Sequence, residues 1–146
     1  MSNAEHIVGS EKLVAVLGYW PSFHDAEVIS VSAQRALPVA LGEASVTLVV
    51  HVRKYEPHGE GTAQYEQVLI KSVLATFLCK QVADLELSEF NHQNVINSLS
   101  VHEELSAEAV GSPLVLTIEP IWGLGGTVRC AVVELSTVQE LLHADA

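Results

Sequence analysis

Apolar residues follow two different spacings along this chain, and the change falls between residues 18 and 29. Residues 10–18 place apolar side chains on one helical face, with Ser10 at an N-cap position and Gly18 as a stop signal. Later segments alternate apolar and polar residues, most clearly over residues 45–53, as expected of a strand with one buried face. The pattern predicts a short N-terminal helix followed by a series of β-strands.

Seven later segments have the length and alternation of strands. The chain shows no helix–strand alternation and no internal repeat, so antiparallel pairing is favoured over a doubly wound sheet. A glycine-rich stretch, residues 123–126, is typical of a hairpin connection. We therefore expect an α+β fold, mainly antiparallel β, with about seven strands in a sandwich or a highly curved sheet. The predicted strands cover residues 29–34, 46–53, 68–78, 82–88, 99–103, 114–118 and 128–135.

Three segments break the alternation. Residues 54–67 are polar and contain proline and glycine, which predicts a loop. Residues 89–98 predict a turn or one short helix, and the last ten residues predict a short helix beginning near Ser136. One or two short helices would then accompany the N-terminal one. We expect a single domain over residues 1–146, in which residues 1–8 are a tag remnant or a disordered segment.

The charge balance of the chain is strongly acidic. The 146 residues include 7 Lys and Arg against 18 Asp and Glu, a formal net charge of −11, while 49% of the residues are hydrophobic. This composition supports a core and excludes intrinsic disorder. It argues against nucleic acid and anionic membranes, which need a basic surface. The acidity suits a basic protein partner, and solubility alone is the alternative explanation. No apolar run suits a spanning helix and no signal peptide is evident, so we expect a cytoplasmic protein.

The spacing of histidines and cysteines does not predict a metal or cofactor site. His24 and Asp25 are adjacent, so in a strand they would point to opposite faces. No histidine shows the short, repeated spacing of a zinc site. Cys79 and Cys130 lie far apart within apolar runs, which predicts two buried thiols. We therefore expect no metal ligand and no cofactor.

No catalytic residue is predicted either. No serine lies in a Gly-x-Ser-x-Gly turn, and residues 123–126 lack the Lys and Ser or Thr that follow in a phosphate-binding loop. Nothing along the chain supplies a nucleophile, a base and an orienting group together. A binding protein is therefore favoured over an enzyme, and an enzyme of unrecognised type is the weakest hypothesis.

The loop at residues 20–27 has two candidate roles. As structure, Trp20 and Phe23 would plug one end of the sheet. As function, His24 and Asp25 would be exposed polar groups held by aromatic anchors, which suits a contact surface. This loop and the polar segment near Asn91 could instead form one small-molecule pocket, which is our alternative function. That pocket would be lined by Trp20, Phe23, His24, Asn91, Gln93 and Asn94.

Three stretches, taken together, resemble the immunity protein 50 family. The resemblance implies a cytoplasmic antidote of a bacterial polymorphic toxin system, which binds a cognate toxin domain and blocks it. It implies no catalytic residue. The stretches are residues 18–27, which contain Trp20, Phe23, His24, Asp25 and Glu27, residues 90–96, which contain Asn91, Gln93 and Asn94, and residues 123–130.

In such a complex an acidic face would cover a basic active site, for example that of a nuclease. The family stretches could be scaffold rather than interface, because toxin-facing surfaces must differ between pairs to be specific. Acidic residues on the strand at residues 82–88 would discourage it from pairing with another copy, and the oligomeric state stays open. The candidate contacts are Glu56, Glu60 and Glu66 in the polar loop, and Asp84 and Glu86 on that strand.

Overall fold

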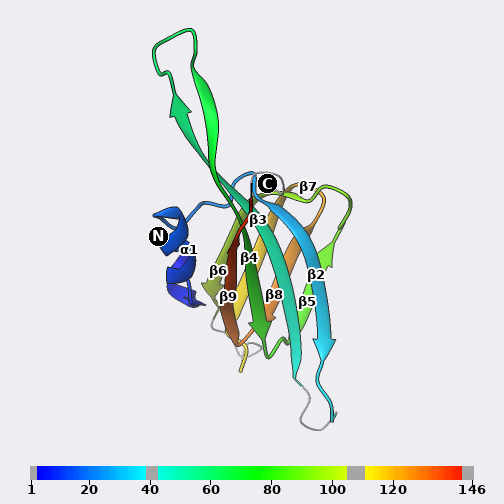
Figure 1. The fold of residues 1–146 in the computed structure, drawn as a ribbon. Helices are drawn as coiled ribbons and strands as arrows, with labels where there is room; N and C mark the ends of the chain where they lie inside the picture. The colour runs from blue at the N-terminus through cyan, green and yellow to red at the C-terminus, as the bar shows by residue number, and fades with distance from the viewer. Residues whose placement is uncertain (1–2, 39–42, 105–110, 143–146) are drawn as a thin grey trace.

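The computed structural model describes residues 3–38, 43–104 and 111–142, and these residues form nine strands and one α-helix (Figure 1). A mainly antiparallel β fold with a short N-terminal helix is confirmed, but there are nine strands rather than seven. A 3-10 turn, η1 (Asn3–His6), precedes β1, and the helix α1 spans Glu11–Leu17. The strands are β1 (Ile7–Val8), β2 (Glu27–Arg35), β3 (Ala44–His58), β4 (Glu66–Lys80), β5 (Asp84–Ser88), β6 (Val95–Glu103), β7 (Leu114–Trp122), β8 (Gly125–Cys130) and β9 (Val132–Glu140).

All nine strands belong to one open sheet with the order β1-β9-β4-β3-β2-β6-β7-β8-β5. Every neighbouring pair is antiparallel except β1 and β9, which are parallel. β2 and β6 are in register only at Glu27 and Val95, so the sheet is nearly divided at this point. We call the two parts the β3 half (β1, β9, β4, β3, β2) and the β7 half (β6, β7, β8, β5).

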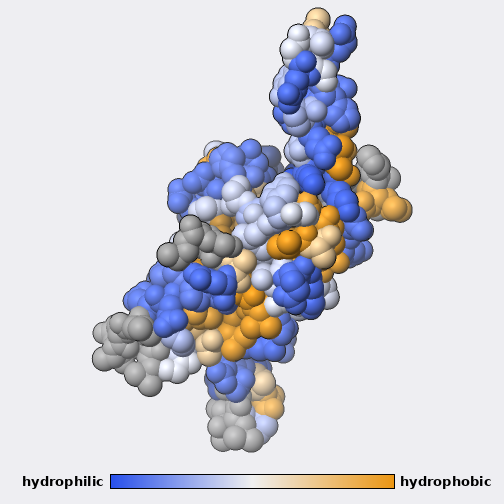
Figure 2. Space-filling view, turned by 90° about the vertical axis from the view of Figure 1, so that its left-hand side faces the viewer, coloured by the Kyte–Doolittle hydropathy of each residue, from blue (hydrophilic) through white to orange (hydrophobic). Residues whose placement is uncertain are grey.

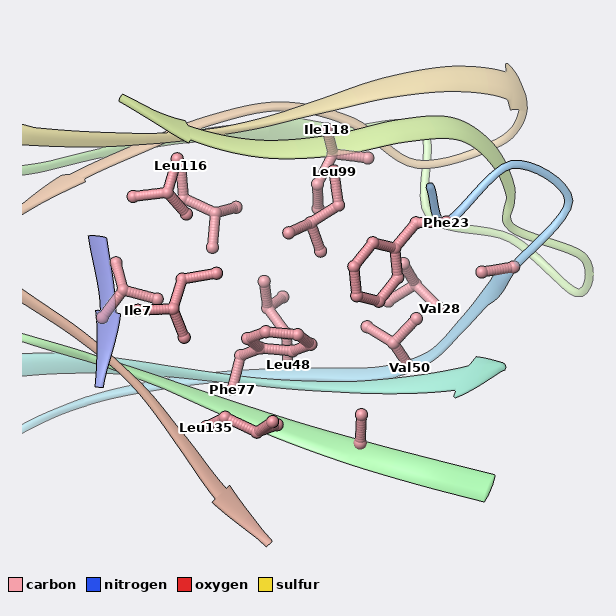
Figure 3. Packing of buried hydrophobic residues seen from close by; sticks show 14 of the residues in the cluster. Ile7, Phe23, Val28, Leu48, Val50, Phe77, Leu99, Leu116, Ile118 and Leu135 are labelled. Carbon is pink, nitrogen blue, oxygen red and sulfur yellow. The ribbon is translucent and has the colours of Figure 1, made fainter. Parts of the chain in front are cut away.

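The core lies between these two halves, because the sheet curves until they face each other (Figure 3). Leu48 and Phe77 point into it from β3 and β4, and Leu99 and Leu116 point into it from β6 and β7. All four side chains are buried. Full burial of each such side chain is worth roughly 1.5–3 kcal/mol, so packing between the halves stabilises the curvature.

The N-terminal segment packs against both halves, because η1 contacts β6 while β1 and α1 contact β9. α1 ends at Gly18, whose φ of 90° is left-handed and whose N–H donates to the Val14 carbonyl at 2.7 Å, as glycine C-caps do. Leu13 and Leu17 are buried in the core. Ser10 occupies the N-cap position, but its side chain makes no capping hydrogen bond. Ile7 in β1 is also buried, so this early strand adds to the core.

The loop predicted over residues 54–67 is confined to residues 59–65, and the prediction was wrong for residues 54–58 and 66–67, which are strand. β3 continues to His58 and β4 begins at Glu66, and these two residues still pair with each other. The reason is that a backbone ladder needs no apolar side chains, so a strand pair with water on both faces has a polar sequence. The paired strands and their turn project from the body (Figure 1), and residues 54–71 are called the ribbon below.

Two other segments predicted to be helical or turn-like contain strand. β6 already begins at Val95, within residues 89–98, after a short loop. β9 continues past Ser136 to Glu140, where a helix was predicted, and residues 143–146 lie outside the described part of the chain. In both places pairing with a neighbouring strand decided the conformation, and such pairing cannot be predicted from local composition.

The strand predicted over residues 128–135 is in fact two strands in different halves of the sheet. β8 pairs with β7, and β9 pairs with β4. The chain bends between them at Ala131, whose N–H donates to the Lys80 carbonyl at 3.1 Å. Buried positions shift from even numbers before the bend, at Val128 and Cys130, to odd numbers after it, at Val133. This split and the short β1 account for the two additional strands.

Candidate functional site

The loop before β2 is anchored by aromatic packing. Phe23 is 2% exposed. Its ring meets Trp20 edge-on at a centroid distance of 5.4 Å and Phe77 of β4 at 5.9 Å. Trp20 is half-buried beside it and packs against the core. These two side chains therefore serve as anchors, and they bring the loop onto the end of the core.

The backbone of this loop is tightly constrained. Phe23 and Asp25 have φ values of 64° and 67°, which are uncommon for residues other than glycine. The Asp25 N–H donates to the Ile96 carbonyl, and the Ile96 N–H donates to the Ala26 carbonyl, both at 2.9 Å. The loop is thus joined to β6, and Glu27 is held in register between His51 of β3 and Val95 of β6.

Asn94 is the hydrogen-bonding centre of the junction between the two halves. Its side chain is buried, with 2% exposure of the residue. The carboxamide nitrogen donates to the carbonyls of Val28 at 3.2 Å and Asn91 at 2.9 Å. The carboxamide oxygen accepts from the N–H groups of Asn91 at 2.9 Å and Leu124 at 3.1 Å. One side chain therefore links the start of β2, the loop before β6 and the β7–β8 turn.

The β7–β8 turn approaches Asn94 so closely that only glycine fits. Gly123 has a φ of 84°, and a Cβ there would lie 2.6 Å from the Asn94 carboxamide oxygen. Leu124 beside it is buried. The turn, the loop before β2 and the segment around Asn94 are the three stretches singled out in the sequence, and the structure brings them together. We call them the junction.

A short chain of polar side chains lies on the surface of the junction. The His24 Nδ1 atom is 3.0 Å from the Asn97 carboxamide oxygen, and the Asn97 nitrogen donates to Glu119 at 2.8 Å. The other ring nitrogen of His24 lies 3.6 Å from an Asp25 carboxylate oxygen. His24 and Asp25 are exposed, so water screens this contact. Exposed polar groups of this kind can contact a partner.

A cavity of about 360 Å³ lies between the loop and β3. Asn91, Gln93 and Asn94 do not line it, although their segment is adjacent to the loop, and Trp20 does not line it either. The two predicted segments therefore meet without sharing one cavity. It is lined by Tyr19, Pro21, Ser22, Phe23, His24, Asp25, Ala26, Val52, Arg53 and Tyr55.

A buried histidine and serine, which the sequence did not single out, lie at the base of the ribbon. His51 and Ser72 are 5% and 4% exposed, and the His51 Nε2 atom is hydrogen-bonded to the Ser72 hydroxyl. Burial and the nearby Arg53 lower the pKa of His51, against an opposing effect of Glu27. Neither His51 nor Ser72 lines the cavity beside the loop, and their hydrogen bond joins β3 to β4. The sequence hinted at this pair only through His51, a histidine on the polar face of the predicted strand at residues 46–53.

The two cysteines meet across the core from opposite halves of the sheet. Cys79 is in β4 and Cys130 is in β8, and both are buried. The hydrogen bond between the thiols and their burial raise the pKa of Cys79. Two buried thiols were predicted, but not that they are neighbours. Among residues 3–38, 43–104 and 111–142 there is no cluster of three metal-ligating side chains, and no helix suited to crossing a membrane.

The predicted acidic contacts fall in two separate places. Glu56, Glu60 and Glu66 lie on the ribbon, where every residue from 55 to 67 is exposed. Asp84 and Glu86 are exposed on β5, at an edge of the β7 half. Figure 1 places the ribbon well away from β5. The predicted acidic contacts therefore form two candidate surfaces, one on the ribbon and one on β5.

The ribbon extends beyond the strands that flank its base. β2 pairs with β3 only as far as His51, and β9 pairs with β4 only from Val73. Figure 2 shows that most of the projecting part is hydrophilic. Between residues 55 and 70 there are three glutamates and no Lys or Arg. Lys54 is held at the base, where its ammonium group donates to the Leu17 carbonyl at 2.8 Å.

The comparison with known families agrees with the resemblance found in the sequence. The family model for immunity protein 50 matches residues 9–141, nearly the whole chain. Searches of curated proteins and of solved structures returned no match. The chain therefore belongs to the immunity protein 50 family.

Proposed function

We propose that this member of the immunity protein 50 family is a non-catalytic cytoplasmic protein that binds a cognate toxin domain and neutralises it, with the ribbon as its main contact. Family membership supports the toxin-neutralising role. The net charge of −11 supports a basic partner surface. The blocking mechanism would be occlusion, in which the ribbon covers a basic active site and prevents the toxin's substrate from entering it.

The observation that carries this proposal is the exposure of the ribbon. A two-stranded hairpin alone is marginally stable in water at best, yet this one extends past β2 and β9 with Tyr55 and Tyr65 about half exposed. Tyrosine is enriched in protein interfaces and in their energetic hot spots. A binding partner that packs on these rings and pairs with the glutamates would explain why the chain carries such an exposed ribbon.

The charge arrangement on the ribbon favours a basic cleft as the target. Glu56, Glu60 and Glu66 are all exposed and form no ion pair with any described residue. Their carboxylates are therefore free to pair with Lys or Arg on a partner. Close charge pairs across such an interface couple by roughly 1.5–7 kcal/mol, so three pairs would dominate the affinity.

The experiment measures binding of the purified chain to toxin domains encoded beside its gene, by co-expression, pull-down and calorimetry. The variant Glu56→Gln/Glu60→Gln/Glu66→Gln should weaken binding roughly 100-fold or more, since losing even two close pairs at the lower limit of about 1.5 kcal/mol each has that effect. The matched control Asp84→Asn/Glu86→Gln/Glu103→Gln changes the net charge equally and should bind like the wild type.

Each outcome decides a separate point. If no toxin domain in a fair set binds, the immunity function is wrong. If a toxin binds but the control variant loses affinity while the ribbon variant does not, the contact surface includes the changed residues of β5 or β6 rather than the ribbon. If both variants lose affinity equally, the effect is one of net charge and the ribbon has no special role.

A second candidate function, a small-molecule binding module, is favoured by the cavity beside the loop. Its volume of about 360 Å³ falls within the usual range for ligand sites, roughly 300–1,000 Å³. Tyr19 and Tyr55 supply aromatic walls, and Arg53 supplies a cation. An NMR fragment screen would test it. Shifts confined to this cavity and lost in Arg53→Gln would support a ligand site, whereas no shifts there would exclude it.

A further inference from the structure

We propose that β2 is an interaction edge through which two copies of this chain pair, independently of the toxin-binding function. On its inner side β2 pairs with β3 along its length. On its outer side β6 is in register with it only at Glu27. From Ser30 to Arg35 no described strand pairs with the outer side, so alternate N–H and C=O groups there face outward without a strand partner.

This edge lacks the protection that edge strands usually carry. Native proteins place charges, proline or bulges on exposed edges to prevent pairing. β5, at the end of the other half, carries the exposed Asp84 and Glu86. Residues 28–34 of β2 contain no charged residue. Its one bulge lies between Val28 and Ser30, before the free part begins.

Charge favours a second copy at this edge over other parts of the surface. Two chains of net charge −11 repel each other, and the repulsion is strongest where acidic groups would face acidic groups. An uncharged strand allows close approach without such contacts. Arg35 at the end of β2 brings a positive charge to the contact, and no ion pair to it occurs within the described residues.

The residue pattern of β2 is self-complementary in an antiparallel pairing. With a two-fold axis at Ser32, Val31 lies opposite Ala33 of the second copy and Ser30 lies opposite Gln34 of the second copy. Directly opposite residues share a face of the sheet. Val31 and Ala33 are in register with the core residues Leu48 and Val46, so apolar residues meet apolar residues on the inner face. The serines and Gln34 meet on the outer face.

An apolar hollow beside the edge supplies further contact area. It has a volume of about 260 Å³, and its lining includes Ala33, Val46, Val82 and Leu85. Leu85 is 38% exposed. The β2 strand of the second copy would extend the inner face of the sheet over this hollow. Val31 of the second copy would then cover part of the exposed apolar surface. Burial of apolar area would then add to the hydrogen bonds of the strand pair.

Analytical ultracentrifugation of the full chain, without any toxin, tests the pairing. The weight-average mass of the wild type should rise with concentration toward twice the monomer mass. Ser32→Lys places two ammonium groups opposite each other at the axis and should keep the chain monomeric. Ser88→Lys makes the same change on the exposed edge strand β5 and should dimerise like the wild type. A wild type that stays monomeric up to roughly millimolar concentration, where an association of about 4 kcal/mol would show, overturns the proposal.

Cross-linking checks the register separately. In Ser32→Cys, two thiols at the axis should form a disulfide between copies when oxygen with copper phenanthroline accepts their two electrons and two protons. Ser88→Cys should not, and the buried native thiols should not react. A disulfide in both variants, or in neither, overturns the β2 pairing. Toxin binding by Ser32→Lys should be unchanged, so failure here is distinguishable from failure of the proposed function.

Discussion

Replacing Asn94 by alanine should destabilise the fold strongly, because this one side chain joins three segments. Two of the groups it satisfies, the Val28 carbonyl and the Leu124 N–H, belong to residues that are 1% and 2% exposed. A buried polar group left without a partner costs about 1–3 kcal/mol, so these two give roughly 2–6 kcal/mol. The groups of Asn91 cost less, because Asn91 is exposed and water can replace the lost bonds. A water molecule entering the vacated space would keep the total near the lower limit.

Urea unfolding, followed by circular dichroism, measures this loss. The matched control is Gln93→Ala, since Gln93 is the exposed neighbour and its side chain makes no hydrogen bond to a described residue; a change within about 0.5 kcal/mol is expected there. Below the unfolding transition, Asn94→Ala should still bind the toxin, because Asn94 is buried scaffold. A loss of less than 1 kcal/mol in Asn94→Ala, or equal losses in both variants, would refute the reasoning.

Three further predictions concern the turn, the buried histidine and the thiols. Gly123→Ala should cost about 2 kcal/mol more in unfolding free energy than Gly61→Ala, because both positions have positive φ but only the first lacks room for a Cβ. Because the pKa of His51 is lowered in the folded state, the unfolded state gains a proton first as pH falls below about 6.5. The free energy of unfolding should therefore drop from there until the folded pKa is reached, by at most about 1.4 kcal/mol per pH unit. His51→Gln should remove this part of the pH dependence when unfolding is measured at pH 7.5 and 5.5. Ellman's reagent should detect neither Cys79 nor Cys130 in the native protein and both after unfolding.

The body of the fold could be predicted because its residues follow one pattern over several positions. Val46, Leu48 and Val50 alternate with less buried residues along β3, and all three are buried. Gly18 ended the helix as expected. The shift of apolar positions from even to odd numbers between Cys130 and Val133 is also visible in the sequence. It would have predicted two strands, β8 and β9, instead of one. Local patterns therefore sufficed wherever one face of an element meets the core.

Long-range contacts account for what the sequence did not reveal. Residues 54–67 of the ribbon are almost all polar, so nothing in their composition distinguished them from a loop. The roles of Asn94 depend on Val28 and Leu124, which lie 66 and 30 residues away. The pairing of His51 with Ser72 likewise depends on the register of β3 and β4. The motif near Asn94 could be identified, but its geometry could not.

The positions of the family stretches indicate how one fold could serve different partners. All three stretches converge on the junction, where Asn94 and Gly123 are too buried or too crowded to contact another protein. The ribbon lies outside them, and so does the free part of β2 beyond Glu27. A two-stranded ribbon with water on both faces places few packing constraints on its side chains, so its charges can change without loss of the core. Partner specificity requires surfaces that differ between pairs. The ribbon, as the proposed contact, is free to vary in this way, whereas the junction is held by packing and hydrogen bonds.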